Sequence, residues 1–314
     1  MLFIASASRS GSTLLDLLLG SHPQGVSTGE IRRLQGFVLQ DKTLLALDDE
    51  DYPLTCSCAK PLKECAFWME VEKQFGASFK HTVFKTRQKR SWRSLLMASY
   101  LATGPQGVRM LARAFSPVRK EVQIGLNCIR LHEAVSLVSG ASFVVDSSKS
   151  IYHYMLLHCA APKLMRLIVL VRDGRGVAHS MVRGTRAKKW QEGPLPPFLQ
   201  ASRQWALTTK SILMLSRRTK PSDKVLLRYE EICSKPLEVL NHMARKWGLL
   251  PWEDSFWKEL KERHIIGGSP SLRFEQLLDR LEPDNRWRQS LDRELLEGFE
   301  KMAGKLNRKL GYFS

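Results

Sequence analysis

The sequence predicts an α/β fold, in which helices flank a parallel sheet. Two observations carry this prediction: short apolar runs end in polar loops, and segments of helical pattern follow those loops. Strand, helix and strand in that order favour parallel pairing, because the helix returns the chain to the same edge of the sheet. The chain has 314 residues, of which 43% are hydrophobic, and can therefore bury one large core. We expect a single domain over residues 1–314.

The first nineteen residues predict a strand, a loop and a helix. The apolar run 1–5 leads into the small polar loop 6–13, and the leucine-rich run 14–19 continues as a helix. The first N–H groups of a helix lack internal partners and carry partial positive charge, so they attract anions. The loop adds a guanidinium, hydroxyls and a flexible glycine: Arg9, Ser10, Gly11, Ser12 and Thr13. We therefore predict a phosphate-binding loop.

The later elements follow a helical interruption. Helical patterns at 92–101, 107–115 and 119–139 predict a mostly helical insertion at about 50–140, on the substrate side. Beyond it we expect strands at 141–146, 166–171 and 224–229, with helices at about 151–160, from 172 and after 236. The segment 287–312 is expected to form a loop and a long charged helix.

A binding site is expected at one edge of this sheet, because ligands of parallel sheets bind beyond the carboxyl ends of the strands. Four residues lie at such ends: Arg9, Lys149, Arg172 and Tyr229. The loop 267–274, which contains Arg273, has the composition of a further anion contact.

Composition narrows the partners and the location. The net charge of +18 favours an anionic partner, which is a nucleotide, an acidic substrate, nucleic acid or an anionic membrane surface. No apolar run reaches the roughly 18 residues of a membrane span. The first apolar run has no basic segment ahead of it, unlike a signal peptide. Six cysteines are too few for a disulfide scaffold at this length, so we expect a reducing, cytoplasmic location.

Three of the cysteines, Cys56, Cys58 and Cys65, lie close together in the sequence. They could bind a metal ion or pair oxidatively, but no fourth ligand stands at zinc-finger spacing, and the nearest histidine is His81. We favour buried thiols or a local disulfide over a metal site. No metal is expected in the chemistry of the protein.

Residues 80–120 are rich in Lys and Arg. A solvated basic face over a core-facing stripe is the simpler interpretation, and peripheral contact with a membrane or with an acidic acceptor is the alternative. Trp92 and Tyr100 are interleaved with the basic residues, which keeps a basic nucleic-acid-binding protein as a further alternative. No recognised nucleic-acid-binding module is present, so that partner is disfavoured.

The first loop departs from the Walker pattern of triphosphate sites. When Gly11 is aligned with the second glycine of that pattern, Ser12 stands in place of its lysine. Only Thr13 then remains as a ligand for Mg²⁺. A P-loop kinase-like phosphotransferase using ATP is therefore an alternative rather than the first choice.

Two segments resemble the sulfotransferases that use 3′-phosphoadenylyl sulfate (PAPS). Residues 9–13 look like their loop for the 5′-phosphosulfate, and 169–181 is similar to their element for the 3′-phosphate. The match is closest to the tyrosylprotein sulfotransferases and the bacterial sulfotransferase-domain proteins. The resemblance implies a P-loop-like fold and PAPS as co-substrate, with the 3′-phosphate held by Arg172 and Ser180.

Further positions fit the resemblance. Glu30 matches the catalytic base of the family, Lys149 resembles a lysine of the bacterial relatives that reaches the sulfonate, and Tyr229 resembles a position that packs on adenine. Asn285 stands where the tyrosylprotein enzymes have a serine, and its amide could still donate to the sulfonate. The simpler alternatives are a helix-start glutamate for Glu30 and a core aromatic for Tyr229.

The sequence thus predicts a transferase that moves a sulfonate group from PAPS to a hydroxyl. Glu30 would deprotonate the acceptor, while Arg9 and Lys149 neutralise the charge that grows on the sulfonate and on the leaving phosphate. The acceptor class is left open among saccharide, lipid, peptide and small metabolite. The sequence does not indicate the oligomeric state.

Overall fold

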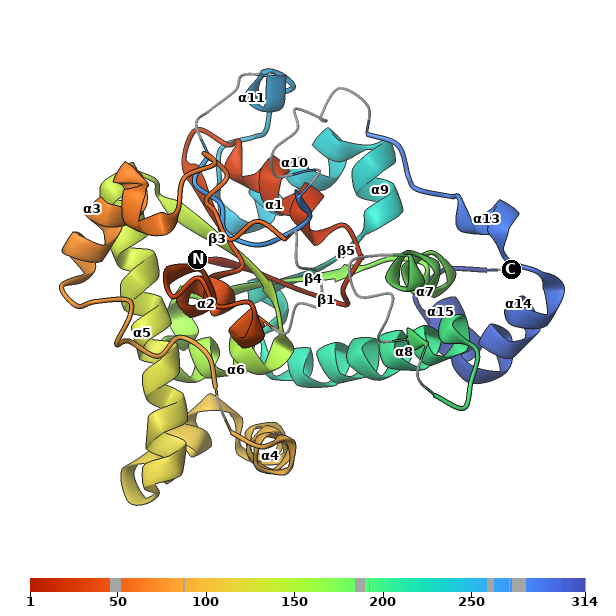
Figure 1. The fold of residues 1–314 in the computed structure, drawn as a ribbon, viewed down its shortest axis with the longest axis horizontal. Helices are drawn as coiled ribbons and strands as arrows, with labels where there is room; N and C mark the ends of the chain where they lie inside the picture. Colours follow the sequence, from red (N-terminus) through yellow and green to blue (C-terminus); the bar gives the residue numbers. More distant parts are fainter. Residues whose placement is uncertain are drawn as a thin grey trace.

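The computed structural model describes residues 1–45, 52–86, 88–183, 190–191, 193–258, 263–270, 272 and 281–313. Within them, five parallel strands form one sheet in the order β2-β3-β1-β4-β5, with helices on both faces (Figure 1). This confirms the predicted α/β fold class. The strands are β1 (Leu2–Ser6), β2 (Gly25–Gly29), β3 (Phe143–Lys149), β4 (Arg166–Val171) and β5 (Lys224–Arg228).

The helices of the described residues vary widely in length. They are α1 (Ser12–Gly20), α2 (Leu34–Val38), α3 (Ala66–Phe75), α4 (Arg90–Ala114), α5 (Ser116–Ser139), α6 (Ile151–Ala160), α7 (Gly174–Val182), α8 (Pro197–Leu215), α9 (Tyr229–Ser234), α10 (Pro236–Trp247), α11 (Ser255–Lys258), α13 (Trp287–Ser290), α14 (Arg293–Phe299) and α15 (Lys305–Lys309). Short 3₁₀ turns include η1 (Ile31–Arg33), and a π-helical turn, η8 (Glu300–Gly304), joins α14 to α15. None of the described helices is long and apolar enough to cross a membrane.

Alternate side chains of β1 enter two different hydrophobic clusters. Phe3 and Ala5 pack on the face covered by α5, α6 and α8, whereas Leu2 and Ile4 pack on the face covered by α1, α9 and α10 (Figure 1). Burial on both faces explains why β1 and β4 are almost uninterrupted apolar runs in the sequence.

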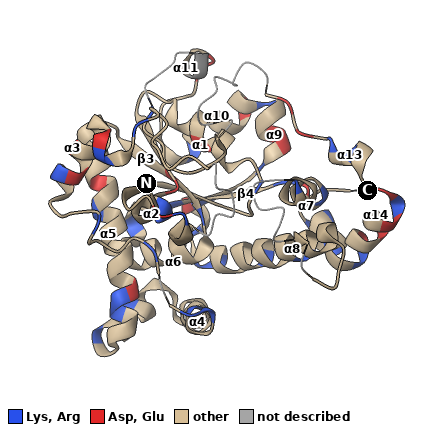
Figure 2. Cartoon of the chain, in the orientation of Figure 1, with Lys and Arg blue, Asp and Glu red and all other residues tan. Residues whose placement is uncertain are grey.

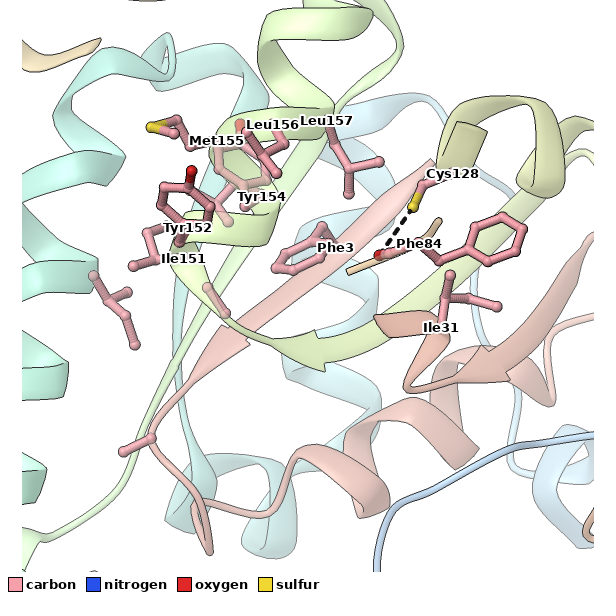
Figure 3. Packing of buried hydrophobic residues seen from close by; sticks show 14 of the residues in the cluster. Phe3, Ile31, Phe84, Cys128, Ile151, Tyr152, Tyr154, Met155, Leu156 and Leu157 are labelled. Carbon is pink, nitrogen blue, oxygen red and sulfur yellow. Dashed lines mark hydrogen bonds between the residues drawn. The ribbon is translucent and has the colours of Figure 1, made fainter. Parts of the chain in front are cut away.

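Phe3 lies at the centre of the first cluster. Its ring is 5.5 Å from the ring of Tyr154 in α6, and Figure 3 shows it among the side chains of that helix. In the same cluster the Cys128 thiol of α5 donates to the Phe84 carbonyl oxygen (Figure 3). Truncating a buried phenylalanine of this kind to alanine costs about 3–5 kcal/mol of stability.

The helices of residues 52–140 share this cluster rather than forming a core of their own. Buried side chains of α3, α4 and α5 belong to it together with those of the sheet. Gly104, with φ 70° and ψ −170°, and Pro105 after it bend α4 between the two predicted helices. Val108 and Ala112, which follow the bend, still belong to this cluster.

Two strand ends differ from the prediction. The strand expected at 141–146 runs at Phe143–Lys149, and its last residue still pairs with Ala5 of β1. Tyr229, expected at the end of a strand, is the first residue of α9. The strand predicted at 166–171 is confirmed residue for residue.

Candidate active site

An open cavity of about 850 Å³ lies at the carboxyl ends of the strands. Every strand of the sheet contributes a residue to its wall from its last position or just beyond: Ser6, Glu30, Lys149, Arg172 and Tyr229. Binding pockets for small ligands have volumes of roughly 300–1,000 Å³, so this cavity has room for a nucleotide.

The wall of the cavity is strongly basic. Seven of its residues are Lys or Arg and three are Asp or Glu: Arg9, Arg32, Arg33, Arg93, Lys149, Arg172 and Arg286 against Glu30, Glu282 and Asp284. The Lys and Arg side chains outside the cavity are spread over many elements, including α5 and α14 (Figure 2). The cavity is therefore suited to an anionic ligand.

The loop before α1 forms one side of the cavity. Arg9, Ser12 and Thr13 line it, and no side chain of the described residues caps the first turn of α1. The N–H groups of that turn remain for a ligand or solvent. Ser10 is buried outside the cavity wall, and its hydroxyl has no hydrogen-bond partner among the described residues.

The structure explains why position 11 is a glycine, which the sequence alone did not. Its φ is 86°, and a Cβ atom there would lie 2.3 Å from Cδ2 of Tyr229. The ring of Tyr229 thus packs directly against the loop backbone. Any larger residue at position 11 would displace this ring and strain the loop.

Glu30 sits in a buried cluster of cations. Its Oε1 accepts hydrogen bonds from Nζ of Lys149 and from the amide of Gly268, which is 3.1 Å away, and its Oε2 is 2.6 Å from Nε of Arg33. Burial by itself would raise the pKa of Glu30, but the positive charges of Arg33, Lys149 and Arg32 outweigh it and lower that pKa to about 2. The carboxylate is therefore ionised.

Lys149 reaches Glu30 through a specific turn at the end of β3. Asp146 accepts a hydrogen bond from the amide of Ser148 at 2.8 Å, and the Ser148 hydroxyl accepts one from the amide of Arg32 at 3.1 Å. Lys149 itself has a positive φ of 67°. The Asp-Ser-Ser-Lys segment thus bends the chain toward the end of β2, where Glu30 lies.

Arg172 is held differently, at the other end of the cavity. It donates from Nη1 to the carbonyl of Arg9 at 3.0 Å and from Nη2 to the carbonyl of Asp284 at 2.7 Å. Its guanidinium lies 4.5 Å from the ring centroid of Tyr229, whose hydroxyl accepts from the Asp284 amide. Three segments therefore converge on one side chain.

The remaining predicted residues are placed as follows. Ser180 lines the cavity from α7. Asn285 is exposed and is not part of the cavity wall, although Asp284 and Arg286 on either side of it are. Arg273 lies outside the described residues.

Sequence reasoning missed several residues of the cavity. Arg33 stands three positions after Glu30 in a 3₁₀ turn, and this spacing is a signal that could have identified it. Arg93 and Met97 reach the wall from α4, and the Arg93 guanidinium lies 4.7 Å from the ring centroid of Tyr152. No local pattern pointed to the amide of Gly268, which approaches Glu30 from far along the chain.

Solved structures that share this fold include three sulfotransferases or sulfotransferase domains. A sulfotransferase domain from the curacin biosynthetic pathway has a TM-score of 0.58 at 20% identity and covers 100% of this chain and 98% of its own. The sulfotransferase domain of the Synechococcus PCC 7002 olefin synthase has a TM-score of 0.53 at 18% identity, and the match covers 96% of this chain and 94% of that domain. Sulfotransferase STF9 from Mycobacterium avium has a TM-score of 0.51 at 13% identity, and the match covers 99% of this chain and 77% of STF9.

These similarities show the fold alone. No curated protein matched the sequence. The sequence profile of the sulfotransferase family, however, matches residues 2–254, which is most of the chain. This chain therefore belongs to the sulfotransferase family.

Proposed function

We propose that the protein transfers the sulfonate group of PAPS to a hydroxyl of its acceptor, with Glu30 as the base. The observation that carries this proposal is the buried contact between Glu30 and Lys149, next to the uncapped first turn of α1 in the same basic cavity. A base and a cation for a growing negative charge then lie side by side.

The cavity has two separate groups of cationic residues, which fit the 5′-phosphosulfate and the 3′-phosphate of PAPS. Arg9, Lys149 and the first turn of α1 would hold the 5′-phosphosulfate, and Ser10, Gly11, Ser12 and Thr13 belong to the same loop. Arg172 and Ser180 would hold the 3′-phosphate. PAPS, when bound, supplies an activated sulfonate with a phosphate leaving group.

Three residues divide the work at the reacting centre. Lys149 donates to the sulfonate as negative charge develops there, with Arg9 acting on the leaving phosphate. As Lys149 turns toward the sulfonate, Glu30 loses one of the charges that lower its pKa, and it becomes a stronger base. Oε1 of Glu30, which the lysine has left, takes the proton of the acceptor hydroxyl. No residue in this scheme needs a metal.

The acceptor would enter beside α4. Arg93 and Met97 of that helix line the cavity, as do Gln204, Thr208 and Ser211 of α8. These side chains mix cationic, apolar and hydroxyl groups, so saccharide, lipid, peptide and small-metabolite acceptors all remain in consideration.

Cytoplasmic location and any peripheral membrane contact stay predictions from the sequence, as does the expected absence of a metal from the chemistry.

Calorimetry tests the nucleotide. We expect 3′,5′-ADP to bind with no requirement for Mg²⁺ and more tightly than ATP. Preference for ATP with Mg²⁺ would favour the phosphotransferase instead. Tight binding to mixed-sequence oligonucleotides that weakens steeply with salt would favour a nucleic-acid-binding protein. Labelled PAPS offered to each acceptor class would then identify the product.

A further inference from the structure

The three neighbouring cysteines meet a histidine from far along the chain. The ligand atoms of Cys56, Cys58, Cys65 and His264 all lie within 4.8 Å of one another. Sγ of Cys58 is 3.6 Å from Sγ of Cys65, and Nδ1 of His264 is 3.3 Å from Sγ of Cys65 and 3.7 Å from Sγ of Cys56. All three thiols are free, so the local disulfide that the sequence allowed is not formed.

The three shorter of these separations are close to those of ligands around one small cation. With Zn–S bonds of about 2.3 Å, two sulfur ligands at the corners of a tetrahedron are about 3.7 Å apart. A sulfur and a nitrogen ligand are slightly closer, because Zn–N bonds are about 2.0–2.1 Å. The set of three thiolates and one imidazole is also a usual one for structural zinc, which soft sulfur ligands favour.

The surrounding residues hold the four ligands in place. The Trp68 indole donates to the His264 carbonyl oxygen at 3.0 Å, and the Phe67 ring stacks on the imidazole at 4.6 Å. The Ser57 hydroxyl donates to the carbonyl of Arg263 and accepts from the amide of Ile265. Cys65 directly precedes α3, so the start of that helix fixes its position.

We propose that Cys56, Cys58, Cys65 and His264 together bind one zinc ion as a closed structural site. This departs from the sequence-based preference for buried thiols, which rested on the lack of a nearby fourth ligand; His264 follows Cys65 by 199 positions. The site has no open position for substrate, so it does not depend on the proposed reaction. Its role is to join the cysteine segment to the segment 263–268, whose Gly268 amide contacts Glu30.

Metal content tests the site in the full-length protein, purified without added metal. Elemental analysis should find about one zinc ion per chain. Replacement of zinc by cobalt should give thiolate-to-metal charge-transfer bands and the intense visible bands of a tetrahedral site. A strong chelator should lower the melting temperature of the wild type.

Cys58→Ala and Cys159→Ala form a matched pair of variants. Cys58 is the least buried of the three cysteine ligands, whereas Cys159 is a buried thiol of α6 outside the cluster. Cys58→Ala should weaken zinc binding at least tenfold and lower the intensity of the cobalt charge-transfer bands, because two of the three thiolates remain, and Cys159→Ala should leave both unchanged.

Two results would overturn the proposal. The first is wild-type protein with no stoichiometric zinc that also fails to bind cobalt after reduction of its thiols. The second is a cobalt spectrum that Cys58→Ala does not alter. The first result needs only the wild-type protein, so a variant that fails to fold does not prevent the test. Neither result bears on the proposed sulfonate transfer.

Discussion

The two ends of the cavity hold their cations in different ways. At the β2–β3 end, Lys149 and Arg33 both contact the carboxylate of Glu30. At the β4–β5 end, Arg172 donates to the carbonyl oxygens of Arg9 and Asp284. The Asp284 carboxylate lies 3.5 Å from Arg172 but is held more closely by Arg286, at 2.8 Å. Carbonyl groups orient a guanidinium without neutralising it, and this more distant, shared carboxylate cancels its charge only in part, whereas Glu30 directly contacts both of its partners. The first arrangement suits groups that exchange partners during a reaction, and the second suits the holding of a fixed anion.

The largest expected effect comes from removing the carboxylate charge at the first end. Glu30→Gln should lower the rate of sulfonate transfer on the order of 10³-fold, because the acceptor loses its base. The affinity for 3′,5′-ADP, measured by calorimetry, should change little. Glu282→Gln is the control, since Glu282 also lines the cavity but is exposed and pairs with no cation among the described residues. Equal loss of transfer and nucleotide binding would assign Glu30 a structural role and erase the contrast between the ends.

The same variant should also change stability in a pH-dependent way. The pKa of Glu30 is about 2 in the folded protein against an ordinary 4.5, so its ionisation stabilises the fold above about pH 4.5, and this contribution is lost as the pH falls through 2. At pH 7, Glu30→Gln should lower the free energy of unfolding on the order of 3 kcal/mol. Urea unfolding at pH 7, 4 and 3 should show the gap to wild type narrowing. A gap that is constant with pH would contradict the charge argument.

At the other end, Arg172→Ala should reduce affinity for 3′,5′-ADP by about 30-fold, or roughly 2 kcal/mol, because a charged hydrogen-bond donor is lost. Arg166→Ala is the matched control, since Arg166 begins the same strand and pairs with Asp223 away from the cavity. Calorimetry measures both variants. Unchanged affinity in Arg172→Ala would mean that this end does not hold the nucleotide.

The smallest effect is expected from substitutions of Tyr229, which test how Arg172 is held in place. Tyr229→Phe loses the hydrogen bond from the Asp284 amide and the contact of the hydroxyl with the Cys233 thiol, but it keeps the ring beside the guanidinium. We expect stability to fall by about 1 kcal/mol and 3′,5′-ADP affinity by no more than a few-fold. Tyr229→Leu removes the ring and should weaken binding further. If the leucine variant binds as tightly as the phenylalanine variant, the ring neither supports Arg172 nor stacks on the base.

The sheet could be predicted because its signals are local. β4 is buried on both faces, so its apolar run marks the strand without ambiguity. α8 was overlooked although its signal is present: Pro197 begins the helix, and Phe198, Trp205 and Ile212 recur at helical spacing on the buried side.

The candidate site was predictable only in part. Glu30, Lys149 and Arg172 each lie at the end of a strand or just beyond it, and the parallel topology brings such residues to one edge. The contacts of Gly268 with Glu30 and of His264 with Cys65 join positions 238 and 199 residues apart, and no local pattern encodes them. Such pairings depend on how whole segments pack, which residue spacing does not reveal.

Ile266, in the segment 263–268, pairs with β2, an edge strand of the sheet. The Glu30 amide donates to the Ile266 carbonyl at 2.8 Å, and the Ile266 amide donates to the Thr28 carbonyl at 3.1 Å. These bonds cover backbone groups that would otherwise invite pairing with a strand of another molecule. A substitution that separates Ile266 from β2 should therefore promote aggregation. The yield of soluble protein would then measure how well the segment that also contacts Glu30 is held in place.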